Sequence, residues 1–206
     1  MQKHPGFVLW FTGLSGAGKT TQLLELAVEW LKADDCSQIP VIFNLAPWKI
    51  TDDRFHIWLE NALVSGYGFS KILAKEAINK NQILPLLDGL DEVGTNEEDD
   101  AAKNALRSHC LKAIDRYLLL DVPYAVICSR IDEYAATSNA PIKAEILINP
   151  LTPKQIKETL TTALSKKLQN KDENAARNLL NTIESHPTLE SVLCTPFYYN
   201  IALDVF

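Results

Sequence analysis

The sequence predicts an α/β fold, in which helices flank a parallel β-sheet and a small helical domain follows. Three observations lead to this prediction. Apolar, β-favouring runs alternate with helical periodicities as far as about Pro150, an order typical of parallel sheets. The run Phe7–Thr12 leads directly into a glycine-rich turn and then an amphipathic stretch. Beyond Pro150 the periodicity is helical alone, so we expect an α/β domain over residues 1–150 and a helical domain over residues 151–206.

The composition is that of a soluble globular protein. Hydrophobic residues make up 47% and charged residues 22% of the 206 residues, and a chain of this length can bury a sizeable core. The net charge of -6 opposes a general grip on nucleic acid. No apolar run reaches the roughly 18 residues of a membrane span, and the N-terminus lacks a signal-peptide pattern. We therefore expect a cytoplasmic protein with no direct nucleic-acid or membrane partner.

The cysteines fit the same interpretation. They are widely spaced, with no C-x-x-C pair, which argues against a metal site or a disulfide framework and fits a reducing compartment. They are Cys36, Cys110, Cys128 and Cys194.

The first part of the chain is expected to form two strands and three helices. Phe7–Thr12 is a run of apolar or β-favouring residues, and Pro40–Leu45 is apolar enough for a strand buried on both faces. Leu24, Val28 and Leu31 recur at helical spacing after the glycine-rich turn. Helices are predicted over Gln22–Lys32, Asp53–Val64 and Phe69–Asn79, with a turn at Gly66–Gly68 between the last two.

The next part is expected to supply three more strands and one helix. Ile83–Asp88 is the third strand, although Pro85 cannot donate to a ladder and is expected at an edge or a bulge. The acidic run Asn96–Asp100 is interpreted as a solvated loop that caps the following helix. That helix is predicted over Ala102–Leu120, and the fourth and fifth strands over Pro123–Cys128 and Glu145–Asn149.

Only helices are expected after Pro150. Thr152 and Gln155 have the spacing of a capping box, and Pro153 takes the favoured first helical position. Thr195–Pro196 interrupts the pattern near the end of the chain. The predicted helices are Pro153–Leu168, Asp172–Ser185, Pro187–Cys194 and Phe197–Phe206.

The glycine-rich turn has the spacing G-x-x-x-x-G-K-[ST] of a phosphate-binding loop. Its glycines allow conformations closed to other residues and let amide groups approach a phosphate, and the helix dipole favours the same anion. Lys19 can reach the β- and γ-phosphates, and the Thr20 hydroxyl can ligate Mg²⁺. We therefore predict that a nucleotide contacts Gly13, Leu14, Ser15, Gly16, Ala17, Gly18, Lys19, Thr20 and Thr21.

A second group of candidate site residues follows the third strand. Asp88 comes at the carboxyl end of that strand, where open α/β sheets bind ligands, and we expect it to hold Mg²⁺ beside Thr20. Hydrolysis also needs a group that orients or deprotonates the attacking water. Asp91 or Glu92 can supply it, and the sequence does not decide between them. Arg130, after the fourth strand, is a candidate to stabilise charge on the γ-phosphate.

Together these stretches resemble the NACHT family of nucleoside triphosphatases, within the STAND class of signal-transducing ATPases. The resemblance extends over nearly the whole chain, to about Phe197. The matching stretches are Gly13–Thr20, Ile83–Val93 and Val126–Arg130 with Asp132–Tyr134. Pro40–Leu45 with Trp48 and Trp58, and Asn149–Pro153, are similar to bacterial members in particular.

The resemblance implies a sheet order of 5-1-4-3-2, which would place Arg130 near the γ-phosphate as a sensor. It also implies that the helical tail closes over the nucleotide, with Pro196 packed near the adenine. Family members continue into winged-helix and repeat or effector regions, so we expect this chain to be a piece of a longer protein. The expected partners are a nucleotide, those other regions, and further copies of the chain through nucleotide-driven self-association.

Three functional hypotheses follow. The favoured one is a switch module that binds ATP or ADP with Mg²⁺ and hydrolyses ATP slowly, in signal transduction or bacterial defence, with Lys19, Asp91, Glu92 and Arg130 carrying turnover. The second is a small-molecule kinase, because Phe7–Thr21 resembles the phosphate loop of adenylylsulfate kinases. Those enzymes place an Asp-Gly motif soon after the first helix, whereas here the nearest is Asp88–Gly89. The third is a scaffold that holds ADP or ATP without turnover.

Overall fold

The structure is a computed structural model that describes residues 7–13, 16–33, 37–118, 124–130, 144–167, 181–183 and 185–205. Contacts divide the chain into two compact units, one of Met1–Gly13 with Lys19–Leu147 and the other of Leu14–Gly18 with Ile148–Phe206. The first unit contains a five-stranded sheet of order β2-β3-β4-β1-β5. Its strands are β1 (Phe7–Gly13), β2 (Ile39–Asn44), β3 (Ile83–Asp88), β4 (Tyr124–Arg130) and β5 (Ala144–Ile148). The predicted α/β fold and strand order 5-1-4-3-2 are confirmed.

The fourth strand is longer than predicted and contains Arg130. β4 pairs in parallel with β1 along its whole length, so that Gly13 lies opposite Arg130. Ser129 is fully buried in this register and accepts a hydrogen bond from Trp10 Nε1 on β1 at 2.8 Å. The prediction that Ser129 and Arg130 follow the strand is therefore wrong, because a buried side-chain bond and continued pairing extend it.

Pro85 lies in an interior strand, against the expectation of an edge or a bulge. β3 pairs with β2 over all six of its residues, whereas its pairing with β4 is recorded only at Leu86 and Leu87. The ladder to β4 thus begins just after the residue that lacks an N–H group. The parallel sheet accommodates the proline by shortening one of its two ladders.

The helices of the first unit are α1 (Lys19–Lys32), α2 (Phe55–Tyr67), α3 (Lys71–Asn79) and α4 (Asp100–Leu118), with a short 3₁₀ turn, η1 (Leu90–Glu92). The predicted turn at Gly66–Gly68 begins too early, since α2 continues to Tyr67. Gly68, with φ of 70°, ends it in the left-handed conformation typical of a C-terminal glycine. Ser70 then caps α3 by accepting from the Leu73 amide at 3.2 Å.

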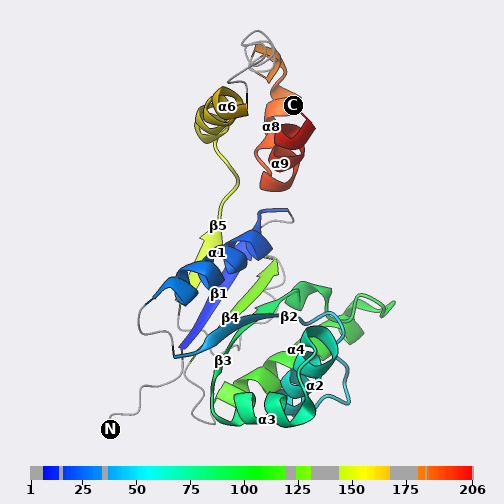
Figure 1. Ribbon diagram of the computed structural model, residues 1–206. Helices are drawn as coiled ribbons and strands as arrows, with labels where there is room; N and C mark the ends of the chain where they lie inside the picture. Colours follow the sequence, from blue (N-terminus) through cyan, green and yellow to red (C-terminus); the bar gives the residue numbers. More distant parts are fainter. Residues whose placement is uncertain are drawn as a thin grey trace. The chain divides into compact units, whose positions relative to one another are not determined.

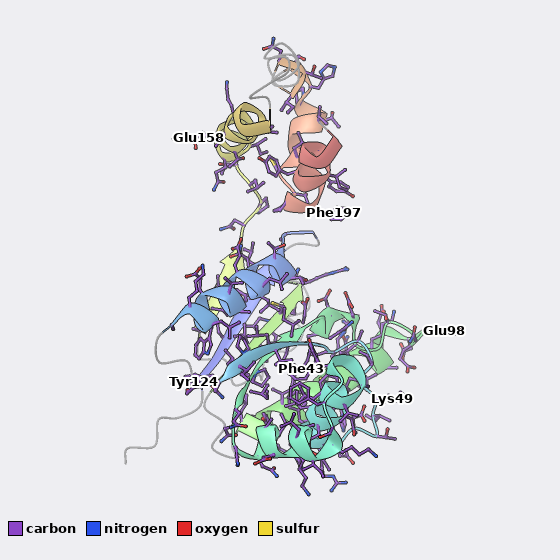
Figure 2. The ribbon with its side chains drawn as sticks, in the orientation of Figure 1. Phe43, Lys49, Glu98, Tyr124, Glu158 and Phe197 are labelled. Atoms are coloured by element: carbon purple, nitrogen blue, oxygen red, sulfur yellow. The ribbon has the colours of Figure 1, made fainter. Side chains whose placement is uncertain are left out.

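One face of the sheet packs against an aromatic layer. Figure 1 shows α2, α3 and α4 grouped on one side of the sheet, and Phe43 of β2 lies among their side chains in Figure 2. Trp48 and Phe55 are also buried, with ring centroids 5.7 Å apart, and Phe55 stacks on Trp58 at 5.5 Å. Burial of this kind contributes most of the stability of such a domain.

The helix after the glycine-rich turn buries less than its periodicity suggests. Leu23 is its one buried residue in the described part, whereas Leu24, Val28 and Leu31 are exposed. The acidic residues before α4 are exposed as predicted, and Glu98 lies at the outer tip of their loop (Figure 2). Asp99 Oδ1 accepts from the Ala101 amide at 3.2 Å, so the loop does cap α4.

The second unit contains α6 (Pro153–Lys167), α8 (Pro187–Leu193) and α9 (Pro196–Val205). The capping box is confirmed, because Gln155 N donates to Thr152 Oγ1 at 3.3 Å and Thr152 N donates to Gln155 Oε1 at 2.8 Å. The core of the second unit consists of Ile156, Leu160, Ile183, Leu193 and Tyr199. The helix predicted over Asp172–Ser185 lies outside the described residues, apart from 181–183 and 185, which are helical. None of the described helices has the length and apolar character needed to cross a membrane.

Candidate functional site

The glycine-rich turn has the backbone that its residues predict. Gly16 and Gly18 have φ of 75° and 82°, in the left-handed region where other residues are strained. α1 begins immediately afterwards at Lys19, and the amide groups in the first turn of a helix point toward its N-terminus, where they can donate to an anion. Gly13 ends β1 without a positive φ. The predicted contacts Leu14 and Ser15 lie outside the described residues.

The next residues connect this loop to the acidic strand end. Lys19 Nζ donates to Gly13 O at 3.2 Å. The Thr20 hydroxyl donates to Asp88 Oδ2 at 2.6 Å, although β4 lies between β1 and β3 in the sheet. The remaining predicted loop contacts differ in exposure, since Ala17 is buried and Thr21 exposed.

The Thr20–Asp88 pair fits a magnesium site. Among the described residues no group of three or more His, Cys, Asp or Glu side chains can hold a metal ion. Mg²⁺ usually takes one or two protein ligands and completes its shell with phosphate oxygens and water. A hydroxyl and a carboxylate already in contact, next to a glycine-rich turn with the spacing of a phosphate-binding loop, match that requirement.

The acidic segment after β3 turns back sharply at Gly89. Gly89 has φ of 77°, and a Cβ built on it would lie 3.2 Å from both Asn44 Oδ1 and Glu92 Oε2. A glycine is therefore favoured on steric and conformational grounds together. The turn that follows, η1, is closed by a 2.9 Å hydrogen bond from Glu92 N to Gly89 O.

Asp91 and Glu92, which the sequence left equivalent, have different surroundings. Asp91 Oδ2 forms an ion pair with Arg130 Nε at 2.9 Å, and the Asp91 side chain is only 10% exposed. Glu92 is exposed. Arg130, 52% exposed in its side chain, thus already has a carboxylate partner.

Sequence reasoning missed one functional candidate, Arg107 of α4. It is 6% exposed, and it donates through Nη2 to Asp91 O at 2.6 Å and through Nε to Val93 O at 3.1 Å. The available signal was its position three residues before Cys110 and seven before Ile114, on the buried stripe of α4. A charged residue on such a stripe needs a buried partner.

A pocket of about 410 Å³ opens beside these residues. The pocket combines acidic and basic side chains, as expected of a site that binds charged groups. Its lining residues are Asp91, Glu92, Thr95, Asp100, Lys103, Asn104, Arg107 and Arg130.

The buried Cys128 thiol lies near the candidate site but is unreactive. Burial raises the pKa of Cys128, the Asp88 carboxylate raises it further, and Lys19 acts in the opposite direction. A thiol with a raised pKa stays protonated and is a poor nucleophile. Cys128 therefore serves packing within β4.

Pro196, the predicted adenine contact, begins α9. Within the second unit, Phe197 N donates to Gly16 O at 3.2 Å, and a Cβ built on Gly18 would lie 3.7 Å from Pro196 Cβ. The start of α9 thus contacts the glycine-rich turn.

Comparisons with known proteins give one extensive and two limited similarities. A family model described as NACHT domain matches residues 8–167. A chain in a solved E. coli MS115-1 HORMA:CdnC:Trip13 complex is similar with a TM-score of 0.51 and 15% identity, over 87% of this chain and 59% of that chain, so the likeness concerns the fold alone. A probable adenylyl-sulfate kinase of Pseudomonas aeruginosa is 90% identical over 21 residues, 10% of this chain and 10% of the kinase.

Proposed function

Because this chain belongs to the NACHT domain family, we propose that it binds ATP with Mg²⁺, hydrolyses it slowly and acts as a nucleotide-dependent conformational switch in signal transduction or bacterial defence. The observation that carries the proposal is the 2.6 Å hydrogen bond between Thr20 and Asp88. This bond joins Thr20 of the phosphate-binding loop to Asp88 at the end of β3. A nucleotide bound together with Mg²⁺ needs ligands from both places.

Lys19 and the loop amides bind the phosphates in this proposal. Lys19 Nζ exchanges its contact with Gly13 O for oxygens of the β- and γ-phosphates, while the first-turn amides of α1 donate to the same anion. Thr20 and Asp88 would hold the metal. Mg²⁺, when bound, offsets the negative charge of the phosphates.

Glu92 is the residue that we assign to the attacking water. A general base must have an accessible carboxylate within reach of the substrate. Asp91 is nearly buried and paired with Arg130 at 2.9 Å, whereas Glu92 is exposed and lines the adjacent pocket. Asp91 then serves to orient Arg130.

The switch arises because ATP has a γ-phosphate that can interact with Arg130 and Lys19, and ADP has none. The γ-phosphate attracts both cations, whereas ADP leaves Arg130 with Asp91. A ligand shifts a conformational equilibrium only by its differential affinity for the two states. The second unit and regions beyond this chain would convert that difference into a signal.

A kinase function has less support. The match to the adenylyl-sulfate kinase covers 10% of the chain, whereas the NACHT match extends over residues 8–167. The two functions differ in the fate of the γ-phosphate, which a kinase transfers to an acceptor and a switch ATPase transfers to water.

Steady-state turnover tests the proposal directly. ADP release is measured with Mg²⁺ and ATP, with and without small-molecule acceptors such as adenylyl sulfate, and GTP replaces ATP in a parallel series. We expect slow, acceptor-independent release of ADP. Acceptor-dependent phosphorylation would favour the kinase, and tight binding without turnover would favour the scaffold.

Lys19→Ala supplies the matching binding test. We expect it to abolish nucleotide binding measured by calorimetry, while Lys32→Ala, at the exposed far end of the same helix, keeps the wild-type affinity. Micromolar affinity in Lys19→Ala would overturn the assignment of the phosphate-binding loop.

A further inference from the structure

Arg107, a buried arginine on α4, donates hydrogen bonds to the backbone of the acidic segment Asp91–Val93. We propose that Arg107 is a positioning residue for nucleotide hydrolysis, which fixes the backbone of Asp91–Val93 so that Asp91 meets Arg130 and Glu92 faces the site. The inference rests on the proposed function, since it concerns the same reaction. It assigns to α4 a role that neither the phosphate-binding loop nor the strand end performs.

Buried side chains of Leu90 and Val93 anchor the two ends of the segment that Arg107 contacts, whereas Asp91 and Glu92 between them belong to a short turn. η1 is a single 3₁₀ turn, and such short turns have weak hydrogen bonds. It is flanked by Gly89 and Gly94, with φ of 77° and 76°, and glycines leave the backbone free to move. An external contact to the backbone of this turn therefore adds to the alignment of Asp91 and Glu92.

Arg107 provides that external contact twice. Nη2 donates to Asp91 O at 2.6 Å, and Nε donates to Val93 O at 3.1 Å. The two carbonyls lie on either side of Glu92, so one rigid guanidinium fixes the backbone both before and after the proposed base.

The contact requires a guanidinium. Its donors lie in one plane at fixed spacing, whereas a lysine ammonium is a point charge on a flexible stem. Lysine at position 107 would keep the charge but is one bond shorter, and it would not present the same pair of parallel donors. A lysine variant therefore separates the charge of Arg107 from its geometry.

The first measurement is kinetic. We expect Arg107→Lys to lower kcat about ten- to hundredfold, because displacement of a catalytic group by about 1 Å has effects of that size. The Kd for ATP should not rise by more than about twofold, since Arg107 does not belong to the phosphate-binding loop. Arg116→Lys, on the exposed part of the same helix, should match the wild type in both quantities.

The second measurement is independent of turnover. Amide hydrogen exchange in the nucleotide-free protein reports on the hydrogen bonds from Glu92 N to Gly89 O, Val93 N to Leu90 O and Thr95 N to Glu92 O. We expect about tenfold faster exchange at these amides in Arg107→Lys, and no change at them in Arg116→Lys.

A double-mutant cycle connects the two measurements. If Arg107 acts through Glu92, then Arg107→Lys should lower kcat by less than about twofold in a Glu92→Gln background, because residues that act as a unit are not additive. A full additional loss would overturn the proposal.

The outcomes separate this inference from the function on which it rests. Absence of turnover in the wild type would overturn the proposed function. Wild-type turnover with an unchanged kcat and unchanged exchange in Arg107→Lys would overturn the positioning role alone. If Arg107→Lys unfolds, Arg107→Gln replaces it. Unfolding of both variants under conditions where Arg116→Lys is folded would also overturn the proposal, because Arg107 would then be a determinant of general stability.

Discussion

Replacing Asp91 by asparagine should increase the preference of the protein for ATP over ADP. The Asp91–Arg130 ion pair occupies the cation that the γ-phosphate needs. In the proposed function, binding of ATP would therefore have to separate the pair, whereas binding of ADP would not. Asparagine keeps the size of the side chain and a hydrogen-bond acceptor but removes the charge, so the competition weakens.

The structure sets the size of this effect. Two unit charges 2.9 Å apart attract by about 1.4 kcal/mol in water and about 6 kcal/mol at an effective dielectric constant near 20. The Arg130 side chain is 52% exposed, and exposed ion pairs contribute at most about 1 kcal/mol. Asp91 is 10% exposed, which raises that value somewhat. We take about 1 to 1.4 kcal/mol, which corresponds to about a five- to tenfold gain in ATP affinity relative to ADP.

The assay is calorimetric titration of Asp91→Asn with ATP and with ADP, both with Mg²⁺. Asp100→Asn is the matched control, because Asp100 lines the same pocket, changes the net charge equally and pairs with Lys103 instead. Arg130→Ala should remove the discrimination between ATP and ADP, and adding Asp91→Asn to it should have no further effect.

Two results would refute this reasoning. If Asp91→Asn leaves the ratio of ATP to ADP affinity unchanged, Asp91 does not compete for Arg130. If Asp100→Asn raises the ratio equally, the cause is net charge and not the specific ion pair.

Two further predictions concern the metal and the backbone. Asp88→Asn should weaken Mg²⁺-dependent ATP binding by about tenfold or more, since a carboxylate is the stronger Mg²⁺ ligand; an unchanged Mg²⁺ dependence in calorimetry would exclude Asp88 as a ligand. Gly89→Ala should lower the free energy of unfolding by about 1–2 kcal/mol through its positive φ and the 3.2 Å contacts of the new Cβ, whereas Gly66→Ala, within α2 and with open space around it, should raise it by about 0.5–1 kcal/mol. Urea denaturation measures both, and changes of the same sign would contradict the conformational argument.

Local patterns were the part of the fold that sequence reasoning could predict. The capping box of Thr152 and Gln155 and the loop before Lys19 depend on residues a few positions apart, and they formed as expected. The strand order came from resemblance to a family, since periodicity alone does not specify which strands are neighbours. Strand and helix ends moved where tertiary contacts extended them, as at Ser129, whose hydroxyl accepts from Trp10 across the sheet.

The contacts of Asp91 show why the candidate site was only partly predictable. Asp91 and Glu92 are adjacent carboxylates with the same local pattern, so no sequence rule distinguishes their roles. The difference arises from Arg130 on β4 and Arg107 on α4, one of which pairs with the Asp91 side chain and the other with its backbone carbonyl. Both contacts join residues far apart in sequence, and the strand order and the packing of α4 bring them together.

The contacts of these two arginines give a physical reason for the slow ATP hydrolysis that we propose. Arg130 is the cation that recognises the γ-phosphate in the proposed switch, yet its partner Asp91 belongs to the segment that orients the proposed base. Movement of Arg130 toward a nucleotide therefore removes one of the contacts that fix Asp91, and the backbone bonds from Arg107 have to maintain Glu92 in place. In the proposed function, recognition of ATP and its hydrolysis thus both depend on residues of η1. Within that proposed function, this shared use of one turn would slow the hydrolysis of bound ATP, as a switch requires.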